Sequence, residues 1–352
     1  MKKMLLTTAL VGSLVSGISS ANAEVKTSVT GNLAISYFAA GSDSTSQTSK
    51  SYNGFGTESQ INLAGTGDLN NGLKYAAGFS WEIDGGESLG SGTGTAANAK
   101  SGTEGTYIEF INGKTVVGVG ADRVANLDGI GSNFVGFGYR YISGIYTSIA
   151  NTTYNDAYNQ FGVYAKQGFD GGSFAVVYTP NSGATNAVTD DIGVSSAKST
   201  VDAGPSSFTV GFQGDLGVKG LGVKAGYASE TKLAAGYKDN TGNVVSVDYQ
   251  MGATKVGLTR GTTTNGYTNE DRTTLEAGIA QALSDTTSVG LAYTRTDSNL
   301  AAKPENEVIV TASVGYNMGP VALTLQYKDS RDTGGVAGQD ATQLGMYLGT
   351  KF

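Results

Sequence analysis

The last twelve residues of the chain, 341–352, read ATQLGMYLGTKF and alternate between two chemical characters. Successive side chains of a β-strand point to opposite faces of a sheet, so this period of two predicts a strand with one apolar face and one polar face. The two faces divide as Leu344, Met346, Leu348, Thr350 and Phe352 against Gln343, Gly345, Tyr347, Gly349 and Lys351.

The same alternation recurs along the whole chain and predicts sixteen strands. Most of these runs are close to the ~9–11 residues that a tilted strand needs to cross the hydrocarbon layer, and the total is even, as in single-chain bacterial barrels. The predicted strands are 25–38, 55–68, 73–81, 105–112, 115–121, 160–169, 173–180, 207–216, 221–230, 243–251, 254–261, 272–283, 288–295, 307–318, 321–327 and 341–352.

The connections between these runs are of two kinds, which alternate strictly. Seven are short and carry Asn, Asp and Gly, which tolerate the positive φ of hairpin turns, as in Asn112-Gly113-Lys114. Eight are long and rich in Ser, Thr, Gly, Asn and Asp, as at 39–54, 122–159 and 262–271. Sorting by length predicts an up-and-down barrel with turns toward the periplasm and loops outside.

No segment after residue 24 contains an apolar run long enough to cross a bilayer as a helix. Inside lipid every backbone polar group must be paired, so a spanning chain of this kind has to close into a barrel. A soluble β-sandwich has the same alternation and is the competing interpretation. The strand number and the sorted loops favour an all-β, 16-stranded antiparallel transmembrane barrel.

The N-terminus has the three parts of a secretory signal peptide. Lys2 and Lys3 precede an apolar stretch that leads to Ala21-Asn22-Ala23. We expect cleavage after Ala23, so that residues 1–23 are the signal peptide and 24–352 form the barrel. Loss of the two lysines takes the formal charge from −7 to −9.

The composition argues against several classes of function. The chain has no Cys and no His, so disulfides and the commonest general base and metal ligand are absent. The acidic balance argues against binding nucleic acid. We therefore expect no enzyme activity, no catalytic residues, no cofactor and no metal.

The final residues, Tyr347-Leu348-Gly349-Thr350-Lys351-Phe352, resemble the carboxy-terminal signature of bacterial outer-membrane barrels. With the signal peptide, the Glu24-Val25-Lys26 start and the sixteen runs, the chain resembles the general porins of Gram-negative bacteria, particularly those of alphaproteobacteria. This resemblance implies a homotrimer and a third external loop that folds into the lumen and narrows it. The longest break here is the third, 122–159.

The resemblance also suggests where a pore constriction lies. The third long break supplies Asp122, Arg123 and Asp128, and the parity of the strands puts Lys74, Lys166, Glu58 and Glu109 on the inner wall. This wall is mixed in charge, and the group of basic residues that the family places opposite its loop is less clear in this sequence. With a net charge of −9, we expect a mild preference for cations.

The expected function is passive diffusion of ions and small hydrophilic solutes through a water-filled channel in the outer membrane, in contact with lipid and lipopolysaccharide. Two alternatives remain open at this point. A sugar-specific channel needs a track of lumenal aromatic residues, for which Tyr107, Tyr164 and Tyr347 are too scattered. An exported adhesin or binding barrel would instead use the long polar loops.

Overall fold

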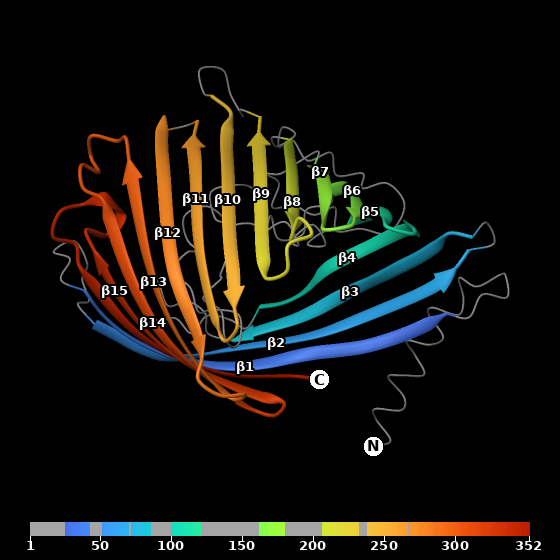
Figure 1. Cartoon of the computed structure of the whole chain (residues 1–352), viewed down its shortest axis with the longest axis horizontal. Coiled ribbons are helices and arrows are strands. Elements are labelled where there is room, and N and C mark those ends of the chain that lie inside the picture. Colours follow the sequence, from blue (N-terminus) through green and yellow to red (C-terminus); the bar gives the residue numbers. More distant parts are fainter. Residues whose placement is uncertain are drawn as a thin grey trace.

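The computed structural model describes residues 25–42, 51–69, 72–85, 100–120, 162–179, 206–231, 238–266 and 268–352. These residues form a closed antiparallel barrel of sixteen strands, in which each strand pairs with its neighbours in the chain and β16 pairs with β1 (Figure 1). The predicted strand number and topology are confirmed. Within the described ranges, no helix is long and apolar enough to cross a membrane.

The strands are from 6 to 18 residues long. They are β1 (Lys26–Ser42), β2 (Ser51–Asp68), β3 (Lys74–Gly85), β4 (Lys100–Asn112), β5 (Thr115–Gly120), β6 (Gly162–Phe169), β7 (Gly172–Thr179), β8 (Ser207–Gly214), β9 (Leu221–Glu230), β10 (Asn240–Met251), β11 (Thr254–Asn265), β12 (Glu270–Ala282), β13 (Thr287–Ser298), β14 (Glu307–Met318), β15 (Val321–Arg331) and β16 (Ala341–Lys351), with a short 3₁₀ turn, η3 (Thr333–Gly335), before β16.

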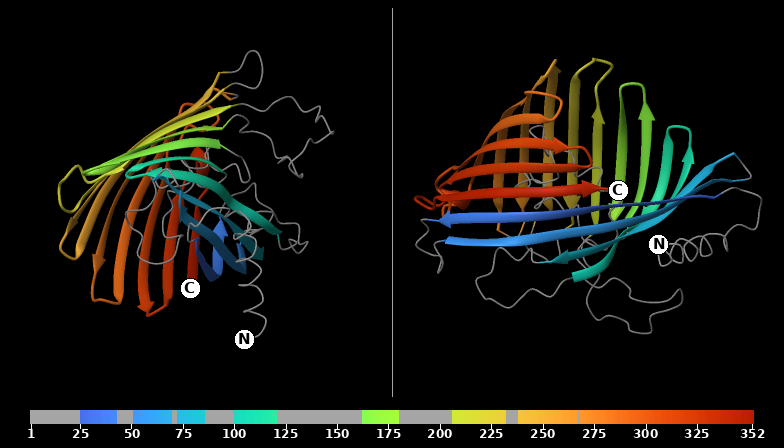
Figure 2. Two further views of the ribbon diagram at one scale, coloured as in Figure 1. Left: turned by 90° about the vertical axis from the view of Figure 1, so that its right-hand side faces the viewer. Right: turned by 90° about the horizontal axis from the view of Figure 1, so that it is seen from below.

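The barrel closes where the last strand meets the first (Figure 2). The ladder between them runs from Asn32 opposite Lys351 to Ser42 opposite Ala341. Phe352 extends it, because its N–H donates to the carbonyl of Gly31 at 3.0 Å and its carbonyl accepts from the Gly31 N–H at 2.8 Å. A Cβ on Gly31 would come within 2.6 Å of Cζ of the Phe352 ring, so glycine leaves room for the terminal aromatic residue at the seam.

Seven short connections lie at one end of the barrel, here called the turn side. They join β2 to β3, β4 to β5, β6 to β7, β8 to β9, β10 to β11, β12 to β13 and β14 to β15. The opposite end is the loop side. Glycines of these turns adopt the predicted positive φ, as at Gly113 (57°), Gly171 (88°), Gly252 (61°) and Gly319 (73°). The β8–β9 turn begins earlier than predicted, because β8 ends at Gly214 and Leu216 takes φ 53°.

On the loop side, several strands run further than the sequence pattern predicts. The expected long break at 262–271 is wrong, because β11 continues to Asn265 and β12 begins at Glu270. Thr262, Thr263, Thr264 and Asn265 are polar, and they pair through the backbone with residues 270–273, which requires no hydrophobic alternation. Hydrophobic alternation therefore does not locate the loop-side ends of these strands.

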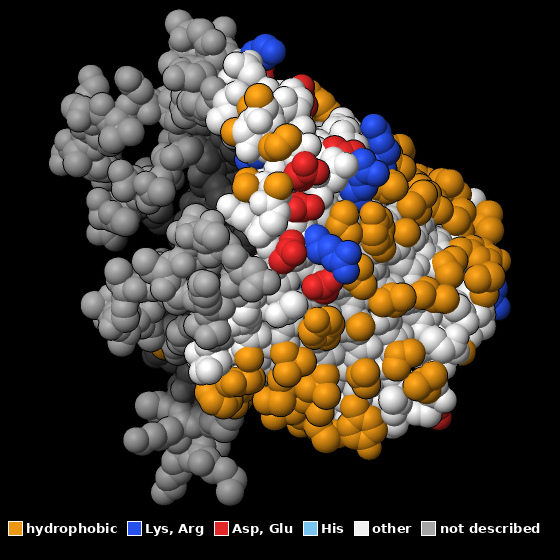
Figure 3. Space-filling model, turned by 90° about the vertical axis from the view of Figure 1, so that its left-hand side faces the viewer, with side chains coloured by type: hydrophobic (Ala, Val, Ile, Leu, Met, Phe, Trp, Pro, Cys, Tyr) orange, Lys and Arg blue, Asp and Glu red, His pale blue; other side chains and the backbone are white. Residues whose placement is uncertain are grey.

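The outer face is apolar through its middle and charged toward the loop side. On β13 the outward residues run Val289, Leu291 and Tyr293 and then Arg295 and Asp297, which form an ion pair of 2.9 Å. Figure 3 shows apolar side chains over this face and charged side chains gathered toward one rim. The apolar band with an aromatic edge has the character of a lipid-facing surface.

The faces predicted from alternation agree with the register. Leu344, Leu348 and Phe352 are exposed on the outside, whereas Tyr347 is buried on the inner face. The proposed signal peptide, residues 1–23, and the third long break, 122–159, lie outside the described residues. The folding of that loop into the lumen thus stays a prediction.

Candidate functional site in the lumen

The inner wall is the surface that faces the lumen, and its side chains are small, polar or charged. One row of paired positions illustrates this composition: Lys26 on β1, Thr66 on β2, Ala76 on β3 and Glu109 on β4. Buried hydroxyls line the wall further round the barrel, and several bond to one another across strands, as Ser246 does with Thr259 at 2.8 Å and Thr274 with Thr296 at 3.0 Å. A solvated lumen needs such a polar lining.

Three of the predicted constriction residues lie on one patch of this wall, over β3 to β6. Lys74 pairs with Ile111, which pairs with Val116, which in turn pairs with Lys166, so the two lysines occupy one row. Glu109 lies in the next row toward the loop side. Lys74 is exposed at the end of its strand, where its Nζ is 3.9 Å from the Asp68 carboxylate.

Glu109 is held in place by an aromatic neighbour. Its Oε1 accepts a hydrogen bond of 2.7 Å from the Tyr164 hydroxyl, and both side chains are buried. The Tyr164 ring lies over Gly118, where a Cβ would come within 2.5 Å of ring atom Cζ and 2.9 Å of the Ile108 carbonyl oxygen. Gly118 thus provides the space that brings tyrosine and glutamate together.

The other predicted site residues are less well defined. Glu58 pairs through its backbone with Ala34 on β1 and with Asp84 on β3, which places it at an inner-wall position of the register; its side chain is not described. Asp122, Arg123 and Asp128 lie outside the described residues. The structure therefore does not test a constriction between these loop residues and the wall.

A second charged group lies on β9 to β11, close to the turn side. Lys255 Nζ is 3.1 Å from Oδ2 of Asp248, and both side chains are largely shielded from solvent. Lys224 stands on the adjacent strand, one step diagonally from Asp248, because Gly222 is the residue paired with that aspartate. A Cβ on Gly222 would lie 2.6 Å from the Asp248 carboxylate, so the absence of a side chain at Gly222 leaves space for this carboxylate.

Glu276 on β12 is the largest fully buried side chain of the described residues. Its Oε2 accepts a hydrogen bond of 3.2 Å from the Thr294 hydroxyl. Its Oε1 has no hydrogen-bond partner among the residues that the structure describes. The neighbouring paired positions on the wall hold Thr259 and Thr294, so the carboxyl group sits in a surround of hydroxyls.

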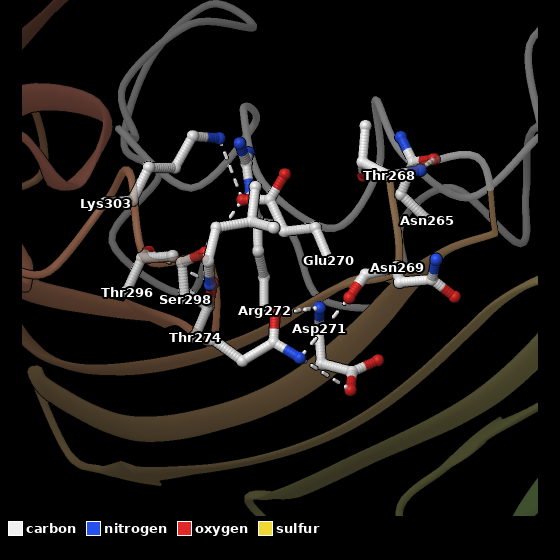
Figure 4. A network of polar contacts seen from close by, with 12 residues as sticks. Asn265, Thr268, Asn269, Glu270, Asp271, Arg272, Thr274, Thr296, Ser298 and Lys303 are labelled. Atoms are coloured by element: carbon white, nitrogen blue, oxygen red, sulfur yellow. Dashed lines mark hydrogen bonds and ion pairs between the residues drawn. The ribbon is translucent and has the colours of Figure 1, made fainter.

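The loop-side mouth carries a network of charges that the sequence did not reveal (Figure 4). Oε1 of Glu270 accepts hydrogen bonds from Arg272 Nε at 2.6 Å, Lys303 Nζ at 2.8 Å and Ser298 Oγ at 2.9 Å. One carboxylate thereby neutralises two cations, one from its own strand and one from the connection between β13 and β14. The i, i+2 spacing of Glu270 and Arg272 is the available signal, but the predicted break at 262–271 includes Glu270.

The inner wall offers a polar lining and fixed charge. No group of three or more acidic, His or Cys side chains within the described ranges is placed to hold a metal ion. Buried hydroxyls bond to one another or to a carboxylate. Such a surface can guide ions and polar solutes by electrostatics.

Comparisons with known proteins agree on one architecture. A family model described as Gram-negative porin matches residues 7–301. A loop-deletion mutant of the outer membrane protein OmpT of Vibrio cholerae is 14% identical, with a TM-score of 0.65 over 93% of this chain and 99% of that one. OmpF of Salmonella typhi, solved with daunomycin, is 14% identical, with a TM-score of 0.65 over 93% and 98%.

A multiple mutant of the porin of Rh. blastica is 15% identical to this chain, with a TM-score of 0.57 over 93% of this chain and 100% of that one. No curated protein matches the sequence. At these identities the solved structures establish the shared fold. The match to the family model is what indicates the kind of protein.

Proposed function

Since the chain belongs to the Gram-negative porin family, we propose that its lumen passes ions and small hydrophilic solutes by passive diffusion across the outer membrane and performs no chemistry on them. Family membership supports the outer-membrane location and the channel function. The observation that carries the assignment is the closed sixteen-stranded barrel with an apolar outer face and a polar inner wall. This distribution is the reverse of that of a soluble barrel with an apolar core.

The test is conductance through a planar bilayer. Purified, folded protein should give discrete open steps whose size rises roughly in proportion to salt concentration and which sugars do not block. Block by a sugar would indicate a substrate-specific channel, and folded protein without steps would contradict the proposal. The inward aromatic residues Tyr107, Tyr164 and Tyr347 lie on β4, β6 and β16, which is too dispersed for a sugar track.

We further propose that Asp122, Arg123 and Asp128 narrow the lumen opposite a wall patch that contains Lys74, Lys166, Glu58 and Glu109. The shared position of Lys74, Glu109 and Lys166 on β3 to β6 supports this proposal. The acidic balance of the chain supports a mild preference for cations. Replacement of Asp122 and Asp128 by Asn should reduce that preference in reversal-potential measurements, and a clear anion preference of the native channel would contradict it.

We also propose an oligomeric state, a lipid contact and a cleaved export signal for this protein. A homotrimer is expected from the resemblance to general porins and is tested by cross-linking in mild detergent. Lipopolysaccharide contact is supported by the outward charges beside the apolar band, Arg295 with Asp297 and Arg331 with Asp329. Cleavage after Ala23 is tested by N-terminal sequencing of the exported protein, which should begin at Glu24.

A further inference from the structure

Lysine is concentrated on the inner wall close to the turn side. Six lysines lie within four residues of the turn-side ends of their strands, and the register places each of them on the inner face. They come from six different strands, β1, β3, β6, β9, β11 and β16, and none of them lies on β12 to β15: Lys26, Lys74, Lys166, Lys224, Lys255 and Lys351. Lysines from strands so far apart in the chain surround most of the lumen rather than form a local patch.

The stagger of the strands brings most of these lysines to one level. With strands about 4.8 Å apart and tilted by about 40°, positions on the register convert to heights along the barrel axis. Four lysines then lie within about 5 Å of one level, and they are defined here as the lysine collar: Lys166, Lys224, Lys255 and Lys351. Lys26 and Lys74 lie about 10 Å nearer to the turn-side opening.

Acidic groups balance the collar only in part. Asp248 is paired with Lys255 at 3.1 Å, and Glu109 accepts a hydrogen bond from Tyr164. Among the described residues, Lys166 and Lys351 make no ion pair. With Asp68, three described acids stand against six lysines on this part of the wall, so the turn-side lumen has a positive balance in a chain whose formal charge is −7.

We propose that the lysine collar is a binding site for small polyvalent anions, which enter it from the turn side of the channel. The inference rests on the proposed channel function and adds a ligand class and a direction to it. An anion with several charges can contact more than one ammonium group at once, whereas a monovalent anion gains only a single weak interaction. The site therefore distinguishes tripolyphosphate from chloride.

The physical basis is overlap of the lysine fields across the lumen. Sixteen strands enclose a barrel about 30 Å across between opposite backbones, and the side chains narrow it further. Screening acts over about 10 Å at 0.1 M salt and about 3 Å at 1 M, so the fields overlap only at low salt. Ammonium groups are strongly hydrated point charges on flexible stems, which favours loose, exchangeable binding over a tight bidentate pair.

The test uses the full channel in a planar bilayer with tripolyphosphate added to one chamber. The chain has no cysteine, so an Ala302→Cys variant, in the exposed segment between β13 and β14, marks the loop side for a membrane-impermeant thiol reagent. At about 0.1 M salt we expect block from the turn-side chamber at a concentration at least tenfold lower than from the loop-side chamber, and about 1 M salt should abolish the difference.

Substitution assigns the block to the collar. The triple variant Lys166→Gln, Lys224→Gln and Lys351→Gln should lose at least tenfold in tripolyphosphate affinity from the turn side. The matched control is Lys219→Gln, which removes a lysine from the exposed β8–β9 turn at the same end of the barrel and should leave block within twofold. The β-strand signal in circular dichroism and the conductance of the open steps show that each variant is folded.

The outcomes separate this inference from the channel assignment. Open steps with equal block from both sides, with no block at all, or with block that survives the triple substitution would overturn the collar as an anion site. Folded protein without open steps would instead contradict the channel function. If the triple variant fails to fold, the sidedness and salt dependence of the Ala302→Cys protein still decide the matter.

Discussion

The two mouths of the barrel carry similar kinds of charge in opposite arrangements. At the loop side, Glu270 accepts hydrogen bonds from Arg272 and Lys303 within 2.8 Å, so the cations there are held against a carboxylate. At the turn side, lysines outnumber acids on the inner wall, and Lys166 and Lys351 make no ion pair with any described residue. Paired charge fixes the shape of a mouth, whereas unpaired charge creates a field in the lumen.

Arginine and lysine are distributed differently between the loop side and the turn side. Of the described arginines, Arg272, Arg295 and Arg331 lie toward the loop-side ends of their strands and pair with acids, whereas Arg260 lies midway along β11. Every basic residue on the turn-side wall is lysine. A planar guanidinium suits a fixed pair, and a mobile ammonium suits a solvated surface. The role of each basic residue therefore depends more on its position in the barrel than on the net charge of the chain.

Reversing the charge of the lysine collar should have the largest effect on the turn-side mouth. Lys166→Glu with Lys351→Glu changes the wall by four charges in a region where no described acid neutralises them. We expect the ratio of cation to anion permeability to rise several-fold at low salt, because charged rings set the selectivity of a pore. Reversal potentials in a gradient of potassium chloride measure it. An unchanged ratio would show that these lysines do not face the permeation path.

A second variant should make the loop-side mouth more like the turn side. Glu270→Gln removes the charge that neutralises Arg272 and Lys303, and we expect the folded state to lose about 1–3 kcal/mol. Tripolyphosphate should then block from the loop side as well. Unfolding by urea and one-sided block check the two effects. Asp271→Asn is the control, because this acid neighbours Glu270 in sequence but lies on the outer face.

Packing around Glu109 offers a smaller test of the turn-side wall. Gly118→Ala puts a Cβ within 2.5 Å of Tyr164 Cζ and 2.9 Å of a backbone oxygen, so the ring must move away from Glu109. We expect a loss of about 1–3 kcal/mol, as for overpacked sites. Gly168→Ala on β6 is the control, because its nearest contact would be 3.3 Å from Lys114 Cβ. Equal stability of both variants would contradict the assigned role of Gly118.

The smallest effect concerns pH at the turn-side rim. A hydrogen bond and the charge of Lys114 lower the pKa of Asp170, which joins two neighbouring turns and is fully exposed. A lowered folded-state pKa means that the contact stabilises the fold above the ordinary pKa of aspartate and is lost as pH falls through the folded value. Titration of the Asp170 carboxyl by NMR should show the shift, and Lys114→Met should remove it. An ordinary pKa in the native protein would show that the contact is not formed.

Much of this architecture could be predicted from local pattern. Alternation identified sixteen strands and separated Leu348 from Tyr347, because side chains of a strand must point to opposite faces whatever the partner strand. The strand ends on the loop side were harder to predict, since polar residues such as Thr263 and Glu270 pair as well as apolar ones but leave no alternating signal. Glu270 was missed as a functional residue for that reason.

The number of strands, the two faces of each strand and the presence of lysines on the inner face can all be predicted from the amino-acid pattern. The folded barrel, in contrast, places Lys166, Lys224, Lys255 and Lys351 at one level and brings Glu270 to Arg272, Ser298 and Lys303. The physical reason is that the face of a strand follows from its own two-residue period, whereas height in a barrel depends on the accumulated stagger of strands paired across long stretches of chain.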